Sequence, residues 1–573
     1  MCGELRTGDV GRTTTLAGWV SRRRDHGGLV FVDLRDPTGL MQLVINPERA
    51  PAATELAKEI RNEFVLQVTG EVVARAPETV NPNMATGGVE LQVAELEIVS
   101  RSTPLPFQLD EEGVDESLRL RYRWLDLRTE RMQRNLRLGA TVVSAIRRSM
   151  EEQGFIDVWT PGLTLGTPEG ARDFLVPVRL QPGTFFALAQ SPQLFKQALM
   201  VGGFDRYYQI ATCWRDEDLR ADRQFEFRQL DLELAFPIRE DVLEVLERVV
   251  VASFEALDRE PPRRPFPRIS YADAMLRYGS DKPDLRFGLE IQDATEVTRG
   301  SDFGVFAGAP AVRFLVVPQA LSRGDLAKLE TFAKEWGAKG LAYLICGPDG
   351  DVRSPIVKFL SEAELGAFAA PPDSTVLLAA DELPGVERVL GALRLHLGRE
   401  LGLVDETREV FHWILNFPLF QPDDETGLWT FVHHPFTGAL EGHEELIEDD
   451  PAKALSQHYD LIWNGWELGS GSIRIHRSDV QQRVFSAMGM TGDEANAKFG
   501  WFLEALQMGA PPHGGFALGV DRFVALLAGE PNIREVTAFP KVSSGSDPLT
   551  GAPSAIPSAV LGELGIRLLE ESR

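Results

Sequence analysis

The segment "CWRDEDLRADRQFEFRQLDLELAF", from Cys213 to Phe236, decides the fold of the region around it. It opens with a charged run and closes with an alternation of polar and apolar residues. Alternate side chains of a strand face opposite sides of a sheet. The alternation therefore predicts a strand with an apolar face, made of Leu230, Leu232, Leu234 and Phe236, and a polar face, made of Gln229, Asp231 and Glu233.

The residues before this strand predict its partner in a hairpin. In "YQIATCWRDE" the side chains of Arg215 and Glu217 are two positions apart, so a strand would place them on one face. Residues 218–228 would form a charged loop that covers an anionic ligand. A polar floor of this kind is too charged for a core, and a solvated surface hairpin is the alternative interpretation.

The composition is that of a soluble protein with several domains. The chain has 573 residues, too many for one hydrophobic core, so roughly three or four domains are expected. Lys and Arg number 59 against 85 Asp and Glu, a net charge of −26, which excludes a uniformly basic nucleic-acid protein. Cysteine occurs only as Cys2, Cys213 and Cys346, which predicts neither a disulfide framework nor a cysteine metal site.

The sequence also predicts a cytoplasmic location without a membrane partner. The N-terminal residues lack the apolar region of a signal peptide. No apolar run approaches the about 18 residues that a membrane-spanning helix needs. A reducing cytoplasm also fits the few, widely spaced cysteines.

Residues 13–100 predict a small barrel. Five strand-like segments, with a helical segment after the third, are typical of the oligonucleotide/oligosaccharide-binding (OB) fold. In the second strand, alternation buries Val30 and Val32 and leaves Phe31 on the polar face. An outward aromatic ring near Arg24 offers single-stranded bases a stacking surface and a cation for their backbone. An ordinary solvated strand with one exposed Phe is the alternative.

A basic strip follows the barrel. Residues 119–137 contain seven arginines and two acidic residues in a chain that is acidic overall. Such a strip is usually a solvated helix face, but beside a base-binding barrel it can also follow the phosphates of a nucleic acid.

Several segments resemble the motifs of one enzyme family. "WRDE" resembles motif 2 of the class II aminoacyl-tRNA synthetases, and "GFALGVDRFVALL" resembles their motif 3. "QGFIDVWTP", with Pro161, resembles motif 1, which supplies the dimer interface in that class. Further segments resemble the bacterial-type aspartyl-tRNA synthetases, namely "TPEGARDFLVP", "QSPQLFKQ", "RDEDLRADRQ", "YGSDKPDLR" and "HHPFT". The resemblance covers nearly the whole chain.

The resemblance implies an α+β multidomain fold. An N-terminal OB-fold β-barrel would precede a class II catalytic domain, built on an antiparallel sheet flanked by helices and interrupted by an α+β domain like the bacterial GAD domain. The expected boundaries are 1–104 for the anticodon-binding barrel, 105–135 for a linker, 136–287 and 405–573 for the two parts of the catalytic domain, and 288–404 for the insertion.

The same resemblance implies an aspartate–tRNA ligase that acts as a homodimer. Attack of the aspartate α-carboxylate on the α-phosphorus of ATP brings two anions together, so positioning and fixed cations should provide most of the catalysis. The implied catalytic residues are Arg215, at the α-phosphate, and Arg522, at the γ-phosphate end of ATP. The implied ATP-binding residues are Arg215, Asp216, Glu217, Gln224, Glu467, Gly519, Val520, Asp521 and Arg522.

The implied aspartate site combines cations for the substrate side chain with acceptors for its ammonium group. The full set is Glu169, Gln193, Lys196, Arg215, Asp231, His433, His434 and Arg474. Asp460 and Glu467 match the acids that hold Mg²⁺, a cation that prefers carboxylate oxygens, and two solvated strand acids are the alternative. Glu467 and Arg474 have opposite parity in a regular strand, so a bulge in "LGSGS" stays an open alternative.

The expected macromolecular partner is tRNA(Asp). The resemblance implies anticodon contacts from Arg24, His26, Phe31, Gln42 and Glu90. His26 is informative, because bacterial enzymes that charge both tRNA(Asp) and tRNA(Asn) often carry His there, whereas strictly tRNA(Asp)-specific ones often carry Leu. Charging of tRNA(Asn) as well and a neutral loop substitution remain two alternatives.

Two residues depart from the family pattern, and two other functions compete. The family usually has Pro at Phe225 and Thr at Arg228. A paralogue that activates aspartate for a small acceptor is disfavoured by the barrel and the basic strip. An inactive RNA-binding regulator would be expected to lose Arg215, Glu467 or Arg522, and the chain has all three.

Overall fold

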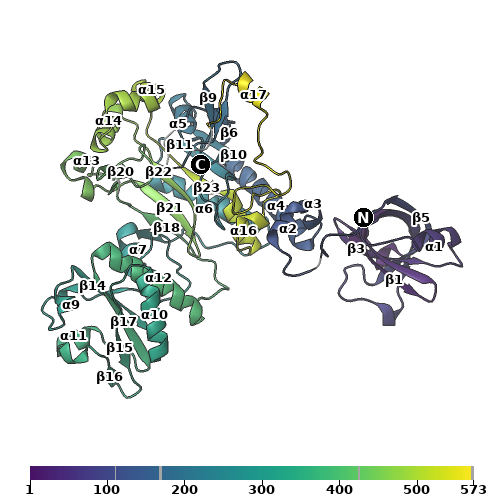
Figure 1. The fold of residues 1–573 in the computed structure, drawn as a ribbon, viewed down its shortest axis with the longest axis horizontal. Helices are drawn as coiled ribbons and strands as arrows, with labels where there is room; N and C mark the ends of the chain where they lie inside the picture. The colour runs from purple at the N-terminus through teal and green to yellow at the C-terminus, as the bar shows by residue number, and fades with distance from the viewer. Residues whose placement is uncertain (110, 167–170, 424–425, 570–573) are drawn as a thin grey trace. The chain divides into compact units, whose positions relative to one another are not determined.

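A computed structural model describes residues 1–109, 111–166, 171–423 and 426–569 of the chain. These residues form two compact units, Met1–Gln133 and Arg134–Arg573, and the division falls within the long helix α4. Figure 1 shows the elements of both units. Each unit is described by itself.

The first unit contains the predicted OB-fold barrel. Its strands close in the order β1, β2, β3, β5, β4. Val30 and Val32 point into the core and Phe31 is half-buried on the outer face, which confirms the predicted alternation. The elements are β1 (Thr13–His26), β2 (Leu29–Asp36), β3 (Gly39–Ile45), α1 (Pro51–Ala57), β4 (Val65–Ala74) and β5 (Val89–Ser100).

Part of the basic strip after the barrel packs within the first unit. Arg128 donates to Glu63 at 2.8 Å and lies 5.0 Å above the ring of Trp19. Arg123 is buried and paired with Asp126. These arginines are therefore structural, which argues against a uniformly solvated basic face. The helices here are α2 (Glu116–Arg121), α3 (Arg123–Asp126) and the start of α4 (Glu130–Glu152).

The second unit is built on a mixed, mainly antiparallel sheet of eight strands. Only the two outermost pairs, β12 with β18 and β10 with β6, are parallel among the described strands of this sheet. In spatial order the strands are β12 (Arg268–Ser270), β18 (Phe411–Leu415), β21 (His458–Trp463), β22 (Trp466–Ile473), β23 (His513–Gly519), β11 (Glu226–Ala235), β10 (Arg206–Trp214) and β6 (Ile156–Asp157).

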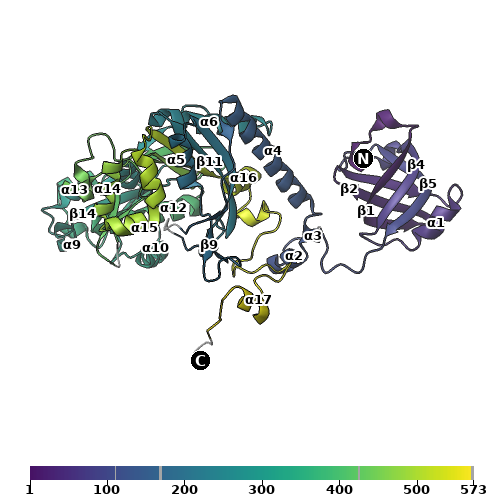
Figure 2. The same cartoon turned by 90° about the horizontal axis from the view of Figure 1, so that it is seen from above.

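The main core lies between one face of this sheet and three helices, α4, α6 (Arg239–Glu255) and α16 (Val520–Ala528), which Figure 2 shows in a second view. Leu230, Leu232 and Leu234 of β11 belong to this core, as their alternation predicts. The opposite face carries the polar residues of β11. The remaining helices of this unit outside the insertion are α5 (Gln193–Val201), α7 (Tyr271–Tyr278), α13 (Leu446–Asp449), α14 (Ser478–Ala487), α15 (Gly492–Gln507) and α17 (Ser558–Glu563).

The chain leaves the large sheet after α7 and forms a separate α+β layer before it returns at β18. The sheet of this insertion has the order β13, β14, β17, β15, β16 and has its own apolar clusters. Its elements are β13 (Gln292–Asp293), α8 (Thr295–Thr298), α9 (Gly304–Ala307), β14 (Ala311–Val317), α10 (Arg323–Glu335), β15 (Ala342–Cys346), β16 (Val352–Arg353), α11 (Glu362–Ala367), β17 (Ser374–Asp381) and α12 (Leu383–Glu400).

Two small sheets complete the fold. One has the order β7 (Leu163–Thr164), β9 (Phe185–Leu188), β8 (Leu175–Pro177), and the other pairs β19 (Phe420–Pro422) with β20 (Trp429–Phe431). No helix among the described residues combines the length and the apolar composition that a membrane span requires.

Candidate active site

The first strand of the hairpin ends earlier than predicted. β10 ends at Trp214, so Arg215 and Glu217 lie in the loop that follows it. The N–H of Arg215 still donates to the carbonyl of Phe225 at 2.9 Å, but the next N–H donates to the carbonyl of Arg172 at 3.1 Å. Pairing with β11 stops there because the backbone has turned to another segment.

The charged loop is held to the C-terminal part of the chain. Gln224 is buried and donates to the carbonyl of Lys541 at 3.2 Å, and it accepts from the N–H of Lys541 at 2.8 Å. Glu217 accepts from Arg223 at 2.9 Å, and the guanidinium of Arg215 lies 5.0 Å above the ring of Phe227. Asp216, by contrast, is exposed.

The polar face of β11 is a buried floor, which confirms the alternation for three of its residues. Gln229, Asp231 and Glu233 have exposed fractions of 9%, 1% and 0%. The apolar face was predicted one residue too long. Phe236 has a φ of +58°, leaves the strand and is 75% exposed, so it does not reach the core.

A buried ion pair joins α5 to this floor. Lys196 donates from Nζ to Asp231 Oδ1 at 3.0 Å and to the carbonyl of Phe516 at 3.3 Å, and Glu233 lies 3.6 Å away. Burial raises the pKa of Asp231 even though Lys196 opposes the shift. Burial would do the same to Glu233, but Arg474 and Lys196 hold its pKa below the usual value.

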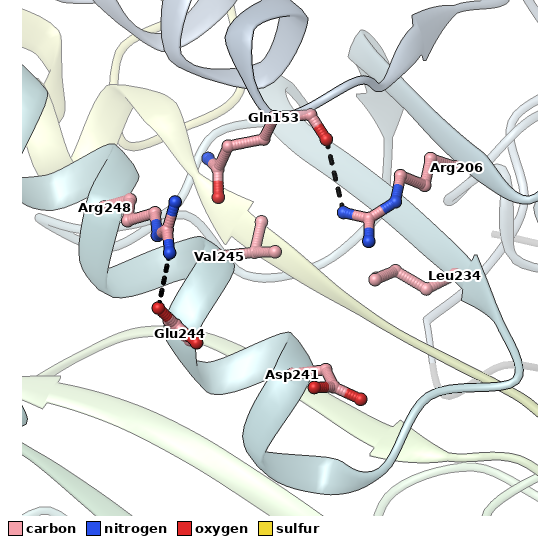
Figure 3. Close-up of a pocket in the computed structure, with 7 residues that line it drawn as sticks. All are labelled: Gln153, Arg206, Leu234, Asp241, Glu244, Val245 and Arg248. Atoms are coloured by element: carbon pink, nitrogen blue, oxygen red, sulfur yellow. Dashed lines mark hydrogen bonds and ion pairs between the residues drawn. The ribbon is translucent and has the colours of Figure 1, made fainter.

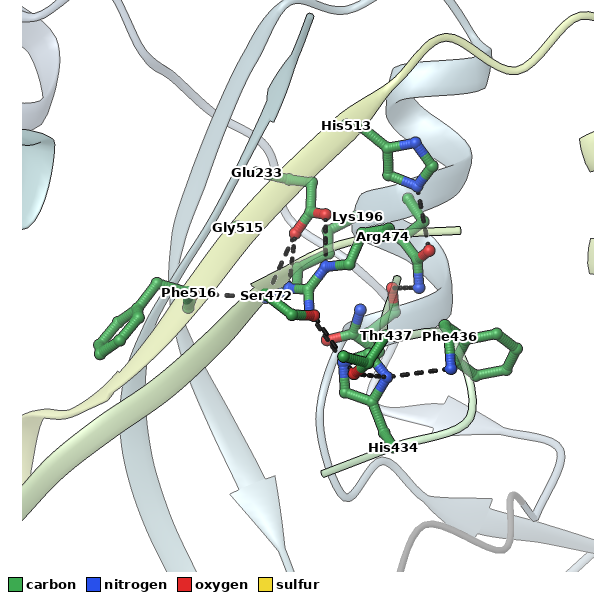
Figure 4. A network of polar contacts seen from close by, with 12 residues as sticks. Lys196, Glu233, His434, Phe436, Thr437, Ser472, Arg474, His513, Gly515 and Phe516 are labelled. Carbon is green, nitrogen blue, oxygen red and sulfur yellow. Dashed lines mark hydrogen bonds and ion pairs between the residues drawn. The ribbon is translucent and has the colours of Figure 1, made fainter. Parts of the chain in front are cut away.

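Arg474 is held on two sides (Figure 4). Its Nε and one terminal nitrogen donate to the two carboxylate oxygens of Glu233 at 2.9 and 3.1 Å. Its other terminal nitrogen donates to His434 Nε2 and to Ser472 Oγ, both at 2.7 Å. Because arginine has only donors, His434 Nε2 must be the acceptor. Burial, followed by the charges of Arg474 and Lys196, lowers the pKa of His434 well below its ordinary value, so this histidine is neutral.

A bulge separates Glu467 from Arg474. β21 pairs Ile462 with Glu467 but pairs Leu461 with Gly469, so one extra residue of β22 lies between them. The bulge changes the parity, which settles the alternative that the sequence left open. Arg474 then follows the end of β22.

Two acids lie near each other on β21 and β22. Asp460 is buried, and its Oδ1 accepts a hydrogen bond from His458 Nε2 at 2.8 Å. Burial and the charge of Asp460 raise the pKa of the half-buried Glu467, whereas Arg522 and Lys282 oppose this. A carboxylate whose charge is disfavoured by burial and by a neighbouring carboxylate can accommodate a divalent cation beside it. Among the described residues no group of three or more His, Cys, Asp or Glu is placed to hold a metal by itself.

The start of α16 presents Arg522 to the same region. Arg522 donates to the carbonyl of Glu467 and, at 2.9 Å, to Asp222 of the charged loop. Gly519 precedes the helix, and Val520 is buried in the core.

Asp521, at the start of the same helix, is paired with Arg228 of β11. It accepts from the side chain of Arg228 at 2.6 and 3.0 Å and from the backbone N–H of Arg228 at 2.8 Å. A residue that departs from the family pattern therefore fixes the helix start.

Two buried polar atoms beside the Lys196 pair have no hydrogen-bond partner in the described part of the chain. They are Gln193 Nε2 and Asp231 Oδ2. Buried polar groups are normally hydrogen-bonded, so these two mark a position for a polar ligand. Glu169, which was predicted to belong here, lies outside the described residues. His433 is nearby, with its ring centroid 4.1 Å from that of His434.

The predicted anticodon residues gather on one face of the barrel. Arg24 donates to Asp33 at 2.8 Å and to Gln42 at 3.4 Å, and Gln42 donates to Glu90 at 3.0 Å. His26 is exposed, and its ring meets that of Phe31 edge-on at 5.9 Å. The first unit therefore offers a half-exposed aromatic ring beside a row of polar groups.

A cavity elsewhere in the second unit does not coincide with any of these groups. It has a volume of about 200 Å³ and is lined by α6 and by the sheet end where β10 begins and β11 ends (Figure 3). Arg248 pairs with Glu244 at 2.6 Å, Arg206 donates to the carbonyl of Gln153 at 3.2 Å, and Asp241 also lines the cavity. Because the cavity is lined by both cations and anions, its charge does not favour one kind of ligand. The candidate active site is therefore the buried polar floor formed by β11 and its neighbours.

Sequence reasoning missed several residues of the site. His458 precedes Asp460 by two positions in β21, and Ser472 precedes Arg474 by two positions at the end of β22, so the period of two could have found them. Glu233 was placed on the polar floor but was not assigned a partner. The contacts of Lys282 and Arg228 join segments far apart in the chain, and no local pattern indicates them.

The comparisons with known proteins agree with this geometry. The model of the family "tRNA synthetases class II (D, K and N)" matches residues 115–543, and that of the "OB-fold nucleic acid binding domain" matches residues 14–99. Together with the fold, the first match defines a class II tRNA synthetase.

Relatives narrow the class further. The chain is 48% identical over 585 residues to the aspartate–tRNA(Asp/Asn) ligase of Mycobacterium avium (strain 104), with 99% of this chain and 98% of the relative covered. It is 47% identical over 580 residues to the aspartate–tRNA ligase of Geobacillus kaustophilus (strain HTA426), with 99% and 98% covered. The chain belongs to the aspartate–tRNA ligase family.

Solved structures show the same fold at low identity. The asparaginyl-tRNA synthetase from Pyrococcus horikoshii complexed with asparaginyl-adenylate has a TM-score of 0.59 at 20% identity, covering 94% of this chain and 97% of that chain. The aspartyl-tRNA synthetase from Entamoeba histolytica also has a TM-score of 0.59 at 20% identity, covering 94% and 90%.

Proposed function

We propose that the protein is an aspartate–tRNA ligase that activates L-aspartate with ATP and transfers it to the 3′ end of tRNA(Asp). The observation that carries the proposal is the buried pair of cations, Lys196 and Arg474, beside the unpartnered Asp231 Oδ2 and Gln193 Nε2. Cations for one end of a ligand and an acceptor for the other match an acidic amino acid.

The side-chain carboxylate of aspartate would bind the remaining donors of the two cations. A guanidinium has five N–H donors. Four of those of Arg474 are used by Glu233, His434 and Ser472, which leaves one for the substrate. Lys196 likewise uses two of its three donors on Asp231 and a carbonyl.

The ammonium group of aspartate would lie at the opposite end of this pocket. Asp231 Oδ2 is the acceptor that lacks a partner in the described structure. Gln193 and Glu169 are proposed to complete this end, as the family resemblance implies. His433 and the neutral His434 would line the pocket without adding charge.

Selection against asparagine follows from the charges of the site. Lys196, Arg474, Asp231 and Glu233 sum to zero net charge. Bound aspartate brings one ammonium for Asp231 and one carboxylate for the cations, so the balance is kept. Asparagine lacks the second charge, and losing a charge-assisted hydrogen bond costs about 1.5–3 kcal/mol, or roughly 10- to 100-fold in affinity.

Arg215 and Arg522 are proposed to serve the activation step. An oxygen of the aspartate α-carboxylate attacks the α-phosphorus of ATP, and the bond to the leaving pyrophosphate breaks. Arg215 would bind both the carboxylate and the α-phosphate, which reduces their repulsion. Arg522 would hold the far end of the triphosphate after giving up its contact with Asp222. Gly519, Val520 and Asp521 would contribute through the backbone at the helix start.

Asp460 and Glu467 fit Mg²⁺, which usually binds to one or two carboxylates together with substrate phosphates. The proximity of Asp460, whose charge adds to the effect of burial in raising the pKa of Glu467, supports the fit. The metal would supply positive charge to the triphosphate.

Glu217 and Gln224 are proposed to face the adenosine part of ATP, with Asp216 beside them.

The transfer step would use the barrel to select the tRNA. Bases of the anticodon are proposed to stack on Phe31 and to hydrogen-bond with Gln42 and Glu90, near Arg24. Charging of tRNA(Asn) as well is a second candidate, because His26 is present and because one relative is named an aspartate–tRNA(Asp/Asn) ligase.

Further properties are proposed from the family. We expect a homodimer in which the exposed apolar residues near Trp159 and Leu163 are covered. We also propose a cytoplasmic location, a GAD-like insertion at 288–404 and the domain boundaries 1–104, 105–135, 136–287 and 405–573.

Aminoacylation with aspartate and separate tRNA(Asp) and tRNA(Asn) transcripts tests the proposal. We expect aspartate-dependent charging of tRNA(Asp). Absence of charging on either transcript would contradict the proposed function, and charging of both at similar rates would establish the broader specificity.

A further inference from the structure

The last helix of the insertion packs closely on the segment that leads into it. This segment, residues 279–287, follows α7 and contacts α12. A Cβ atom at Gly279 would lie 2.2 Å from the carbonyl oxygen of Glu387 and 2.8 Å from Gly391 on α12. No side chain fits between the two backbones at this point, so the segment and the helix are in direct backbone contact.

A buried arginine of α12 fixes the rest of the segment. Arg394 is 1% exposed and donates to the carbonyls of Asp284 and Phe287 at 2.8 and 3.0 Å. Its guanidinium lies 4.9 Å from the ring of Tyr278 and 4.1 Å from that of Phe287. Burial lowers the pKa of Arg394 to about 10, which still leaves it charged at neutral pH. A buried cation is costly, and the hydrogen bonds that compensate this one are donated to two backbone carbonyls of the segment.

The opposite side of the segment reaches the proposed ATP site. Asp284 lies against Gly465, in the turn that joins β21 to β22, where an added Cβ would be 3.2 Å from Asp284 Cβ. Lys282, two residues earlier, has its Nζ 4.0 Å from Glu467 Oε2. The side chain of Lys282 is 51% exposed, so this cation can change partners without repacking the core.

We propose that Lys282 is a further phosphate-binding residue of the ATP site and that Arg394 of the insertion is the positioning residue that holds it there. This inference rests on the proposed function. Before ATP binds, Lys282 Nζ lies 4.0 Å from Glu467 Oε2. The long flexible stem of lysine then allows Nζ to reach an anionic ligand bound beside Glu467 and Arg522. The insertion thereby contributes to ATP binding through a segment of the catalytic fold.

Substitution of Lys282 in the full chain tests the first half of the proposal. We expect Lys282→Ala to raise the KM for ATP about 5- to 20-fold in aspartate-dependent ATP–pyrophosphate exchange, because a charge-assisted contact is lost. The KM for aspartate and the Kd for tRNA should change less than about twofold. Lys282→Arg should retain most of the affinity. Lys453→Ala is the matched control, since Lys453 is 77% exposed and paired with Asp450 at 2.7 Å.

A double-mutant cycle tests the second half. Arg394→Met keeps the apolar bulk but removes the donors, and it should raise the KM for ATP without a matching change in the KM for aspartate. In the Lys282→Ala background the same change should add less than about twofold, because Arg394 acts through Lys282. Arg394→Lys keeps the charge and should restore part of the affinity. Circular dichroism melting confirms that each variant is folded.

The possible outcomes distinguish a failure of the proposed function from a failure of the inference about Lys282 and Arg394. Wild-type protein without aspartate-dependent exchange would contradict the proposed function itself. Normal wild-type exchange together with an unchanged KM for ATP in Lys282→Ala would overturn only the inference about Lys282. Multiplicative effects of the Lys282 and Arg394 substitutions, or unfolding of both Arg394 variants, would show that Arg394 stabilises the fold generally and would overturn its positioning role.

Discussion

Glu233 and Arg474 form a two-point ion pair at 2.9 and 3.1 Å between the last part of β11 and the residue after β22, and both side chains are almost completely buried. The pair orients the guanidinium so that one N–H remains for a ligand. A buried ion pair adds little net stability, but removing one partner leaves an uncompensated charge.

Glu233→Gln should weaken aspartate binding strongly. Loss of one member of a buried pair costs about 3–5 kcal/mol, part of which appears in binding, so we expect kcat/KM for aspartate to fall by about 100-fold or more. ATP–pyrophosphate exchange at varied aspartate concentration measures this. Glu244→Gln, at an exposed pair with Arg248, is the control. An unchanged KM for aspartate would show that Glu233 does not orient Arg474.

Arg215→Ala should abolish adenylate formation while tRNA binding stays nearly intact. Arg215 lies at the start of the charged loop, where its guanidinium lies 5.0 Å above the ring of Phe227 and donates no hydrogen bond to another described side chain. It is therefore available for the substrate anions. Exchange activity and a filter-binding Kd for tRNA(Asp) are the two measurements. Normal exchange in this variant would refute the assignment of Arg215.

The buried His412 should make the second unit sensitive to acid. Both its ring nitrogens lack partners in the described structure, and burial lowers its pKa from 6.5 to about 3. Between these values the unfolded chain binds a proton that the folded chain does not, so stability falls as the pH falls, by about 1.4 kcal/mol per unit.

His412→Leu should flatten this dependence. From pH 6.5 to 5.0 the variant should lose about 2 kcal/mol less stability than the wild type. Urea unfolding followed by tryptophan fluorescence measures it, because the buried Trp413 is adjacent. Identical pH slopes for the two proteins would mean that His412 is protonated or hydrated in the folded state.

Phe225→Pro, which restores the residue usual in the family, should loosen the charged loop. The ring of Phe225 meets Phe174 edge-on at 5.3 Å and lies where a Cβ on Gly545 would be. Loss of these contacts should increase hydrogen exchange of the backbone around Arg223 and raise the KM for ATP a few-fold. Unchanged backbone hydrogen exchange in the charged loop would show that the hydrogen bonds between Gln224 and Lys541 are sufficient to hold the loop in place.

His26→Leu tests the specificity for tRNA. His26 is exposed beside Phe31, so its removal should not affect folding. We expect the variant to charge tRNA(Asn) less well, by about tenfold for a lost base contact, while charging of tRNA(Asp) changes little. Equal losses on both transcripts would indicate a general contact with the tRNA instead of a base-specific one.

Much of the site could be predicted because it lies on strands. The period of two placed Asp231 and Glu233 on a polar face, and the family motifs identified Lys196 and Arg474 as cations. The loops were less predictable. The end of β10 at Trp214 depends on a hydrogen bond to Arg172, which is far away in the chain, and no local pattern encodes such a contact.

Dependence on contacts that are distant in the sequence also explains the other differences between the predicted and the observed structure. Phe236 continues the apolar alternation, but its positive φ turns it out of the sheet. The bulge in β22 was left open because glycine permits it without requiring it. The partners of Arg228 and Arg394 are set by packing between distant segments, so their roles became visible only in three dimensions.

The four buried charges of Lys196, Arg474, Asp231 and Glu233 cancel one another. This neutrality determines how the binding of each substrate depends on ionic strength. Added salt screens exposed charges and has little effect on a closed, neutral group of buried ones. Recognition of the amino acid should therefore be almost indifferent to salt, whereas capture of the polyanionic tRNA should weaken steeply as salt rises. The two halves of the reaction would then respond separately to the ionic conditions of the cell.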